Sequence, residues 1–329
     1  MDFSGLPKIE LHLHLDCSLS YKVVKALKPQ VSEEEYRKNY VAPSKCTNLL
    51  EYISCAASSI DIMQTEKELE RVTLDLFEQL KADNVIYAEI RFAPLQHLQK
   101  GLSPNQVVEA VLRATEAGIK LTDVQAGIIL CTLRNFSKEE SLATVELVEE
   151  YKGTHVVGFD IAADEAGFPI DNHIKAFEYA RDHGIPCTAH AGEACGPESV
   201  WETLNHFHPK RIGHGIRSIE DPVLIDFIKY KNIHLEVCPT SNICTNVFAK
   251  MEDHSINNLY EQGVSLSINT DGRALSDVTL EDEYAKLNHY FGWMHEHFYT
   301  CNREAIDAAF TSPEIKLLLH EKLKTGFGH

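Results

Sequence analysis

Residues 8–16 read KIELHLHLD, and this stretch alternates apolar and polar side chains in the manner of a β-strand. Side chains in a strand point to opposite faces with a period of two, so Glu10, His12, His14 and Asp16 share one face. Two imidazoles at i and i+2 on one face can converge on a cation. Histidines that only pack in a core or on a surface are the more common reason for such a pair. An inward-facing position favours the cation, because unpartnered polar groups are costly to bury.

Seven further segments have strand length and are rich in apolar and β-branched residues, and helical patterns such as 103–121 and 139–153 lie between them. The segments are 85–94, 124–134, 156–165, 185–193, 211–217, 232–242 and 263–271. Eightfold alternation of strand and helix predicts an α/β fold of the (β/α)8 TIM-barrel type. A doubly wound open sheet is the competitor, but no G-x-G-x-x-G follows the first strand and no P-loop is present.

The first and second predicted strands are separated by an unusually long segment, about residues 17–84. Residues 32–40 and 65–83 within it have helical patterns, so an ordered insertion is expected there. We predict one domain over residues 1–329, with this insertion forming a helical lid above the carboxyl end of the first strand.

Composition narrows the class of partner. The 329 residues carry a formal net charge of -18, which disfavours nucleic acid and anionic membrane because these are bound by clustered Lys and Arg. There is no apolar run of membrane-spanning length and no leader-like N-terminus, so a cytoplasmic protein is expected. Nine cysteines without a C-x-x-C pair are expected to be reduced thiols.

Reactive groups of such barrels come from the carboxyl ends of the strands. The polar residues at the predicted ends are His12, His14, Asp16, Arg91, Arg134, Asp160, Asp164, His190, Glu193, His214, Glu236 and Asp271. Imidazole and carboxylate are ligands that zinc favours, and a catalytic zinc site keeps one position open. His12, His14 and His190 with Asp271 would supply three nitrogens and one oxygen.

Five motifs together carry a resemblance to a known family. HLHLD (12–16), HAGE (190–193), RIGHGIR (211–217), LEVCPTSN (235–242) and NTD (269–271) occur in this order over nearly the whole chain. The chain thereby resembles the adenosine deaminase family of the amidohydrolase superfamily. The resemblance implies one Zn²⁺ per chain, or another divalent metal, and a small-molecule purine nucleoside substrate. It implies hydrolytic deamination of adenosine to inosine and ammonia.

The same resemblance implies residue roles, each of which has a simpler alternative. His12, His14, His190 and Asp271 would bind the metal, and Glu193, His214 and Asp271 would be catalytic, with Glu193 giving a proton to purine N1. Asp16 and His14 would contact the substrate, and Glu236 and Ser241 would orient the histidines. The alternatives are a helix N-terminal carboxylate for Glu193, a helix cap for Asp16, and simple pairing of Asp160 and Asp164 with Arg91.

Three positions depart from the family pattern where the substrate is expected. Gly272 replaces an Asp that contacts purine N7, Ala163 replaces a Gly whose N–H contacts N3, and Cys17 replaces the Gly after HLD. Arg273 or a water could contact the base edge instead.

The substrate alternatives are adenine, an N6-substituted adenine compound, methylthioadenosine and aminodeoxyfutalosine. A catalytically decayed zinc- or nucleoside-binding protein, and a phosphotriesterase-like barrel hydrolase, are hypotheses of other classes. The H-x-E plus P-C-x-x-C type of zinc deaminase is excluded, because the second motif is missing.

Overall fold

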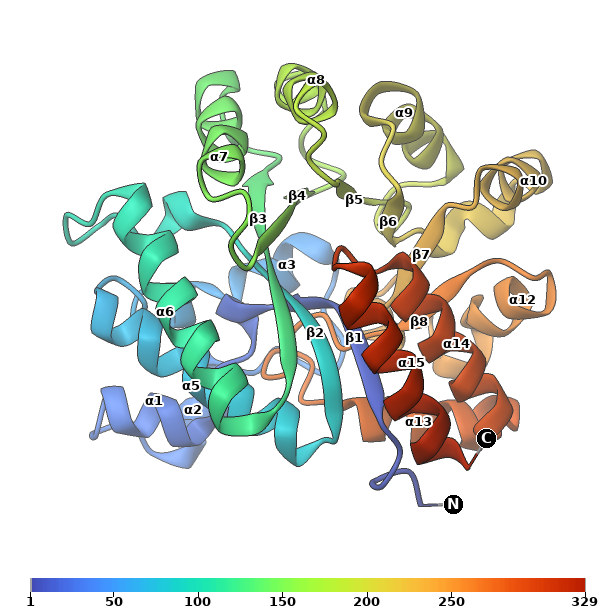
Figure 1. Ribbon diagram of the computed structural model, residues 1–329, viewed down its shortest axis with the longest axis horizontal. Coiled ribbons are helices and arrows are strands. Elements are labelled where there is room, and N and C mark those ends of the chain that lie inside the picture. The colour runs from blue at the N-terminus through green and yellow to red at the C-terminus, as the bar shows by residue number, and fades with distance from the viewer. Residues whose placement is uncertain (1, 329) are drawn as a thin grey trace.

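Eight parallel strands form a closed ring in the computed structural model, which describes residues 2–328 (Figure 1). The strands are β1 (Lys8–His14), β2 (Val85–Phe92), β3 (Gln125–Leu133), β4 (Val156–Ala162), β5 (Thr188–Ala191), β6 (Arg211–His214), β7 (His234–Val237) and β8 (Leu266–Ile268). They pair in order as two four-stranded sheets, β1 to β4 and β5 to β8. Parallel bridges between Phe159 and Cys187 and between Leu13 and Asp271 join the two sheets on both sides. The predicted (β/α)8 barrel is therefore confirmed, and the open doubly wound sheet is excluded.

Helices surround the ring, as Figure 1 shows for α6 to α10 and α12. The segment between β1 and β2 holds η1 (Leu15–Cys17), α1 (Tyr21–Leu27), α2 (Glu33–Asn39), α3 (Leu49–Ser54), α4 (Ala57–Ile60) and α5 (Glu66–Ala82). After β2 come η2 (Pro94–His97), α6 (Pro104–Thr122), α7 (Lys138–Glu150), α8 (Ile174–Asp182), α9 (Pro197–Phe207), η3 (Ile216–Glu220) and α10 (Pro222–Lys231). The last third adds α11 (Pro239–Cys244), η4 (Met251–Asp253), α12 (Ile256–Glu261), α13 (Leu280–Phe291), α14 (His295–Ala308) and α15 (Pro313–Phe327).

Local sequence explains where these helices begin and how closely they pack. Before α6, the Ser103 hydroxyl accepts the Gln106 N–H while the Gln106 side chain accepts the Ser103 N–H, and Pro104 takes the first helical position. Gly118 on the same helix packs against Phe77 of α5, where an added Cβ would lie only 2.4 Å from the ring. The missing side chain thus allows α5 and α6 to approach closely.

The insertion between β1 and β2 has two parts. Its last helix, α5, packs against α6 and β2 and so belongs to the outer ring of helices. Helices α3 and α4 instead contribute Leu49, Ile53 and Ala57 to a cavity that also holds residues from the carboxyl ends of the strands. The function of segment 17–84 as a lid stays a prediction.

The seam between β8 and β1 is closed partly by a side chain. Strand β8 ends at Ile268, and the Asn269 side-chain oxygen accepts the N–H groups of Leu11 (2.8 Å) and His12 (3.1 Å). Asp271 continues the pairing, since its N–H donates to the His12 carbonyl and its carbonyl accepts the His14 N–H. The carboxylate of Asp271 is thereby held beside the two β1 histidines.

A network of fully buried charges fills the ring at mid-height. Arg91 of β2 donates to Asp160 of β4 (2.8 Å) and to Glu236 of β7 (2.6 Å), and Arg211 of β6 lies 2.7 Å from the other Glu236 oxygen. Buried charges are tolerated only when they are paired and hydrogen-bonded. This network therefore ties four strands together from the inside.

No helix within residues 2–328 is long and apolar enough to cross a membrane. All nine cysteines are free thiols.

Replacing Arg91 by Leu is expected to lower the free energy of unfolding by about 3–5 kcal/mol, because two buried carboxylates lose a partner. The matched control is Arg113→Leu, which removes surface ion pairs to Glu66 and Glu70 and should cost no more than about 1 kcal/mol. Urea unfolding of both variants checks the difference. Equal losses would show that the interior network contributes no more than a surface pair.

Candidate active site

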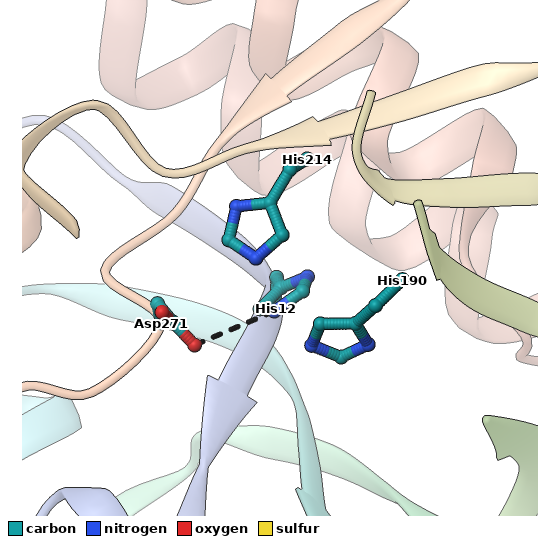
Figure 2. A group of neighbouring side chains, drawn as sticks. All are labelled: His12, His190, His214 and Asp271. Carbon is teal, nitrogen blue, oxygen red and sulfur yellow. Dashed lines mark ion pairs between the residues drawn. The ribbon is translucent and has the colours of Figure 1, made fainter. Parts of the chain in front are cut away.

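Four side chains converge at the carboxyl end of the barrel, as Figure 2 shows. His12 comes from β1, His190 from β5, His214 from the end of β6, and Asp271 from the loop after β8. Their nearest ligating atoms all lie within 4.8 Å of one another, and all four side chains are buried. His214 and Asp271 adopt positive φ angles (61° and 63°), which turn the chain sharply at the strand ends and aim these side chains inward.

His14, which was predicted as a ligand, lies in the same place. Its Nε2 is 3.2 Å from His190 Nε2 and 3.3 Å from Asp271 Oδ1, and His12 Nε2 is 3.5 Å from that same oxygen. Two ligands held about 2.1 Å from a tetrahedral zinc ion are about 3.4 Å apart, so these spacings fit a shared metal. His12 Nε2 is also buried without a hydrogen-bond partner. The donor set therefore fits a metal ion, with His14 and His214 as the two candidates for the fourth ligand.

Carboxylates hold two of the histidines in position. His12 Nδ1 lies 2.9 Å from Glu236, and His190 Nδ1 lies 3.0 Å from Asp160, so the Nε2 atoms of both rings point toward the cluster. Such a carboxylate behind the ring is typical of metal-binding histidines. Asp160 thus does more than pair with Arg91, whereas Asp164 does not join that network and lines the cavity.

Ser241 is hydrogen-bonded to Asp271, the candidate ligand that supplies an oxygen. Its hydroxyl donates to Asp271 Oδ2 at 2.6 Å, which leaves Oδ1 for the histidines. Of the two residues predicted to orient the histidines, Glu236 contacts His12, whereas Ser241 contacts Asp271 instead.

Glu193 is a buried acid next to the cluster. It follows Gly192, whose φ of +68° provides a turn directly after β5. Its Oε2 lies 3.5 Å from His214 Nε2, and its Oε1 accepts from the Thr245 hydroxyl. Burial, and then the negative charges of Asp271 and Glu165, raise the pKa of Glu193 well above its usual value. A carboxyl group in this environment keeps its proton and can donate it.

Glu165 is a positioning residue that the sequence did not reveal as functional. Its carboxylate accepts the backbone N–H groups of Gly192 (2.7 Å), Glu193 (3.1 Å) and Cys195 (2.9 Å). It therefore fixes the loop that carries Glu193. Its place just after β4, in the stretch IAADE, was the available signal.

One cavity of about 410 Å³ opens onto these groups. Such a volume suits a small organic molecule. His14, His190, Glu193, His214 and Asp271 form its polar end, and helices α3 and α4 form an apolar wall. Among the described residues, no Lys or Arg lines this cavity. Its polar side chains outside the catalytic end include Asp16, Gln96, Asn135 and Asp164.

Asp16 lies in η1, because β1 ends at His14 and not at residue 16 as expected. Burial raises the pKa of Asp16 to about 6, against the hydrogen bond from the Cys17 thiol. Asp16 still lines the cavity, as predicted for a substrate contact.

Cys17 and Gly272, two of the residues that depart from the family pattern, are in contact with each other. A Cβ added to Gly272 would lie 2.7 Å from Cys17 Cβ and 3.1 Å from the Tyr52 hydroxyl. The space that an Asp side chain would use is thus occupied by Cys17 and Tyr52. Arg273 cannot serve as the alternative base contact, because it is buried against Glu10 and Asp83 and does not line the cavity.

Ala163, the third departure, lines the cavity with a φ of 80°. This left-handed conformation favours glycine, so the alanine is strained.

A barrel whose strand ends present histidines and a carboxylate for a metal, beside a buried acid, defines a metal-dependent hydrolase of the amidohydrolase type. Comparison with known proteins specifies the family: the family model described as adenosine deaminase matches residues 7–326, and the chain belongs to that family. The family comprises hydrolases that act on C–N bonds of cyclic amidines.

Named relatives agree with this assignment. A curated protein of Clostridium acetobutylicum named adenosine deaminase is 36% identical over 326 residues, with 97% of each chain covered. Among solved structures, the chain superimposes on adenine deaminase of Arthrobacter aurescens with a TM-score of 0.91 (24% identity, 98% and 100% of the chains covered). It superimposes on Arabidopsis N6-mAMP deaminase with a TM-score of 0.86 (26% identity, 98% and 99% covered).

We expect His14→Ala to weaken zinc binding by about 100-fold or more, while His214→Ala changes it by less than about 10-fold. The reason is that the Nδ1 atom of His214 faces the Asn242 amide (3.1 Å), unlike His12 and His190, which are backed by carboxylates. Zinc content after dialysis against a competing chelator measures both. The opposite ranking would assign the fourth ligand to His214.

The contact between positions 17 and 272 predicts energetic coupling. Gly272→Ala alone should destabilise the protein by about 1–3 kcal/mol through overpacking, and Cys17→Gly should relieve part of that loss. A double-mutant cycle by urea unfolding is expected to give a coupling energy of about 1 kcal/mol. Additive effects would mean that the two positions vary independently.

Proposed function

We propose that this protein deaminates adenosine hydrolytically to inosine and ammonia, using a zinc ion held by His12, His14, His190 and Asp271. The observation that carries the proposal is the buried Glu193, whose pKa is raised by burial, beside a metal-fitting cluster at the end of one cavity. The curated relatives named adenosine deaminase support the substrate class.

A zinc ion bound there would supply a water molecule that is nucleophilic near neutral pH. Glu193 would donate its proton to N1 of the purine, which makes C6 more electrophilic for the water oxygen. The Asp271 carboxylate would take one proton of the attacking water and pass it to the exocyclic amine, which leaves as ammonia. The balance is one water consumed, the C6–N bond broken and a C6–O bond formed, with one water proton leaving in the ammonia and the other returning to Glu193.

The lining of the cavity favours an uncharged ribose end. We infer that Asp16 accepts a ribose hydroxyl and that the backbone N–H of Ala163 contacts the base, whereas Gly272 is packed against Cys17 and Tyr52 and does not line the cavity. A 5'-phosphate would meet Asp16 and Asp164 without a Lys or Arg from the described lining. Like charges at close range disfavour binding strongly. We therefore expect a preference for a nucleoside over a nucleotide, in contrast to a nucleotide deaminase such as the Arabidopsis N6-mAMP enzyme.

The test is ammonia release by zinc-loaded protein from adenosine, adenine, methylthioadenosine, AMP and N6-methyl-AMP. Adenosine should be turned over, with a kcat/KM for AMP lower by about 100-fold or more. Asp16→Asn should narrow that gap, because it removes a negative charge without shortening the side chain. Preference for a nucleotide, or for adenine alone, would replace the proposed substrate.

Glu193→Gln separates catalysis from binding in the same assay. It should abolish turnover and leave the zinc content unchanged, since the amide keeps the size of the side chain but cannot act as the acid. The matched control Glu198→Gln, in the first turn of α9, should retain turnover. An active Glu193→Gln protein would refute the assignment of the acid.

A further inference from the structure

Three buried polar side chains form a line that starts at the backbone of α12 and ends at His214. The N–H of Ile256 donates to His254 Nδ1 (3.0 Å), and His254 Nε2 lies 3.2 Å from Asn242 Oδ1. Asn242 Nδ2 then lies 3.1 Å from His214 Nδ1. His254, Asn242 and His214 are 3%, 0% and 1% exposed, so water cannot replace these partners.

Hydrogen-bonding rules assign every proton along this line. A backbone N–H can only donate, so His254 Nδ1 must accept, and the proton of a neutral imidazole then sits on Nε2. Burial lowers the pKa of His254 to about 3, which keeps the ring neutral. His254 Nε2–H donates to the Asn242 oxygen, and this directs the Asn242 NH₂ group to His214.

The opposite arrangement places two donors against each other. Turning the Asn242 amide around would set its NH₂ against His254 Nε2–H. Moving the His254 proton to Nδ1 would set it against the Ile256 N–H. Since an unpaired buried donor is costly, the backbone of α12 determines the orientation of the amide.

The tautomer of His214, the last side chain of the line, follows from the same contacts. His214 Nδ1 accepts from Asn242, so in the neutral ring the proton sits on Nε2. This Nε2 is the atom that faces the candidate metal cluster and lies 3.5 Å from Glu193 Oε2. A nitrogen that carries a proton has no lone pair for a metal ion.

We propose that Asn242 and His254 are positioning residues that lock His214 in its Nε2–H form, so that His214 offers a hydrogen-bond donor, not a ligand atom or a base, to the reacting oxygen. This inference rests on the proposed function for its catalytic meaning, while the protonation state itself can be measured without turnover. It makes Asp271 the group that accepts the proton of the attacking water, because His214 Nε2 already carries a proton and Glu193 is the proton donor of the proposed reaction.

The tautomer is read directly by ¹⁵N NMR of zinc-loaded protein with labelled histidines, with the His214 signals assigned from a His214→Gln sample. We expect the Nε2–H pattern for His214 in the parent protein. An Nδ1–H pattern would overturn the proposal, and this measurement needs no variant of the line itself to fold.

Asn242→Asp replaces the group that donates to His214 Nδ1 by one that can only accept a hydrogen bond. A carboxylate can accept from His254 Nε2–H with one oxygen but cannot donate with the other, so His214 should change to the Nδ1–H form. We expect kcat on adenosine to fall by about 100-fold or more, with KM and zinc content nearly unchanged. An unchanged tautomer with unchanged kcat would overturn the proposal.

Two further comparisons separate positioning from general destabilisation. Asn302→Asp alters an equally buried amide that binds the Ile9 N–H and the Tyr284 hydroxyl, and it should leave the His214 tautomer and kcat unchanged. His254→Gln, whose amide can still donate to Asn242, should retain the Nε2–H form, whereas His254→Leu should lose it. Equal effects of the Gln and Leu variants would contradict the proposed line.

The two proposals fail separately. An Nε2–H form of His214 in a protein that releases ammonia from no aminopurine would refute the proposed function and leave the tautomer assignment intact. Turnover of adenosine by a protein whose His214 has the Nδ1–H form would refute the tautomer assignment and leave the proposed function intact.

Discussion

One guanidinium determines how the candidate metal site is built. Arg91 binds Asp160 and Glu236 in the dry interior of the barrel, and each carboxylate also holds one histidine, His190 and His12 respectively. Because the charges are buried, neither carboxylate can turn away without depriving the guanidinium of one of its two buried carboxylate partners. The orientation of two candidate ligands is thus set by the same interaction that links β2, β4 and β7.

Main-chain contacts at the seam between β8 and β1 position another candidate ligand, Asp271. Asp271 does not extend from a regular strand but pairs with β1 through its backbone, with Asn269 covering the N–H groups before it. Candidate ligands from opposite ends of the chain are therefore held next to each other by main-chain contacts. Rigid backbone support of this kind keeps reactive groups at fixed separations.

The sequence could predict the elements of this site but not most of its contacts. The alternation in KIELHLHLD places His12 and His14 on one face, and the motif resemblance adds His190, Glu193, His214 and Asp271. The double role of Asp160, the loop bonds of Glu165 and the line through Asn242 join residues that are distant in the chain, and no local period encodes them. Strands β5 to β8 are shorter than expected partly because residues such as His214 and Asp271 turn the chain in left-handed conformations, which periodicity does not detect. The sequence allows Arg273 as a contact to the base edge, and only its long-range ion pairs with Glu10 and Asp83 exclude that role.

The contact between Cys17 and Gly272 also constrains how this pocket can change over generations. A carboxylate at position 272 does not fit while Cys17 and Tyr52 occupy the space, so a mutation that introduces it first carries a stability cost. A loss of side-chain volume at position 17 opens the space beforehand. The order of substitutions therefore matters, because a smaller residue at position 17 lowers the stability cost of a larger residue at position 272.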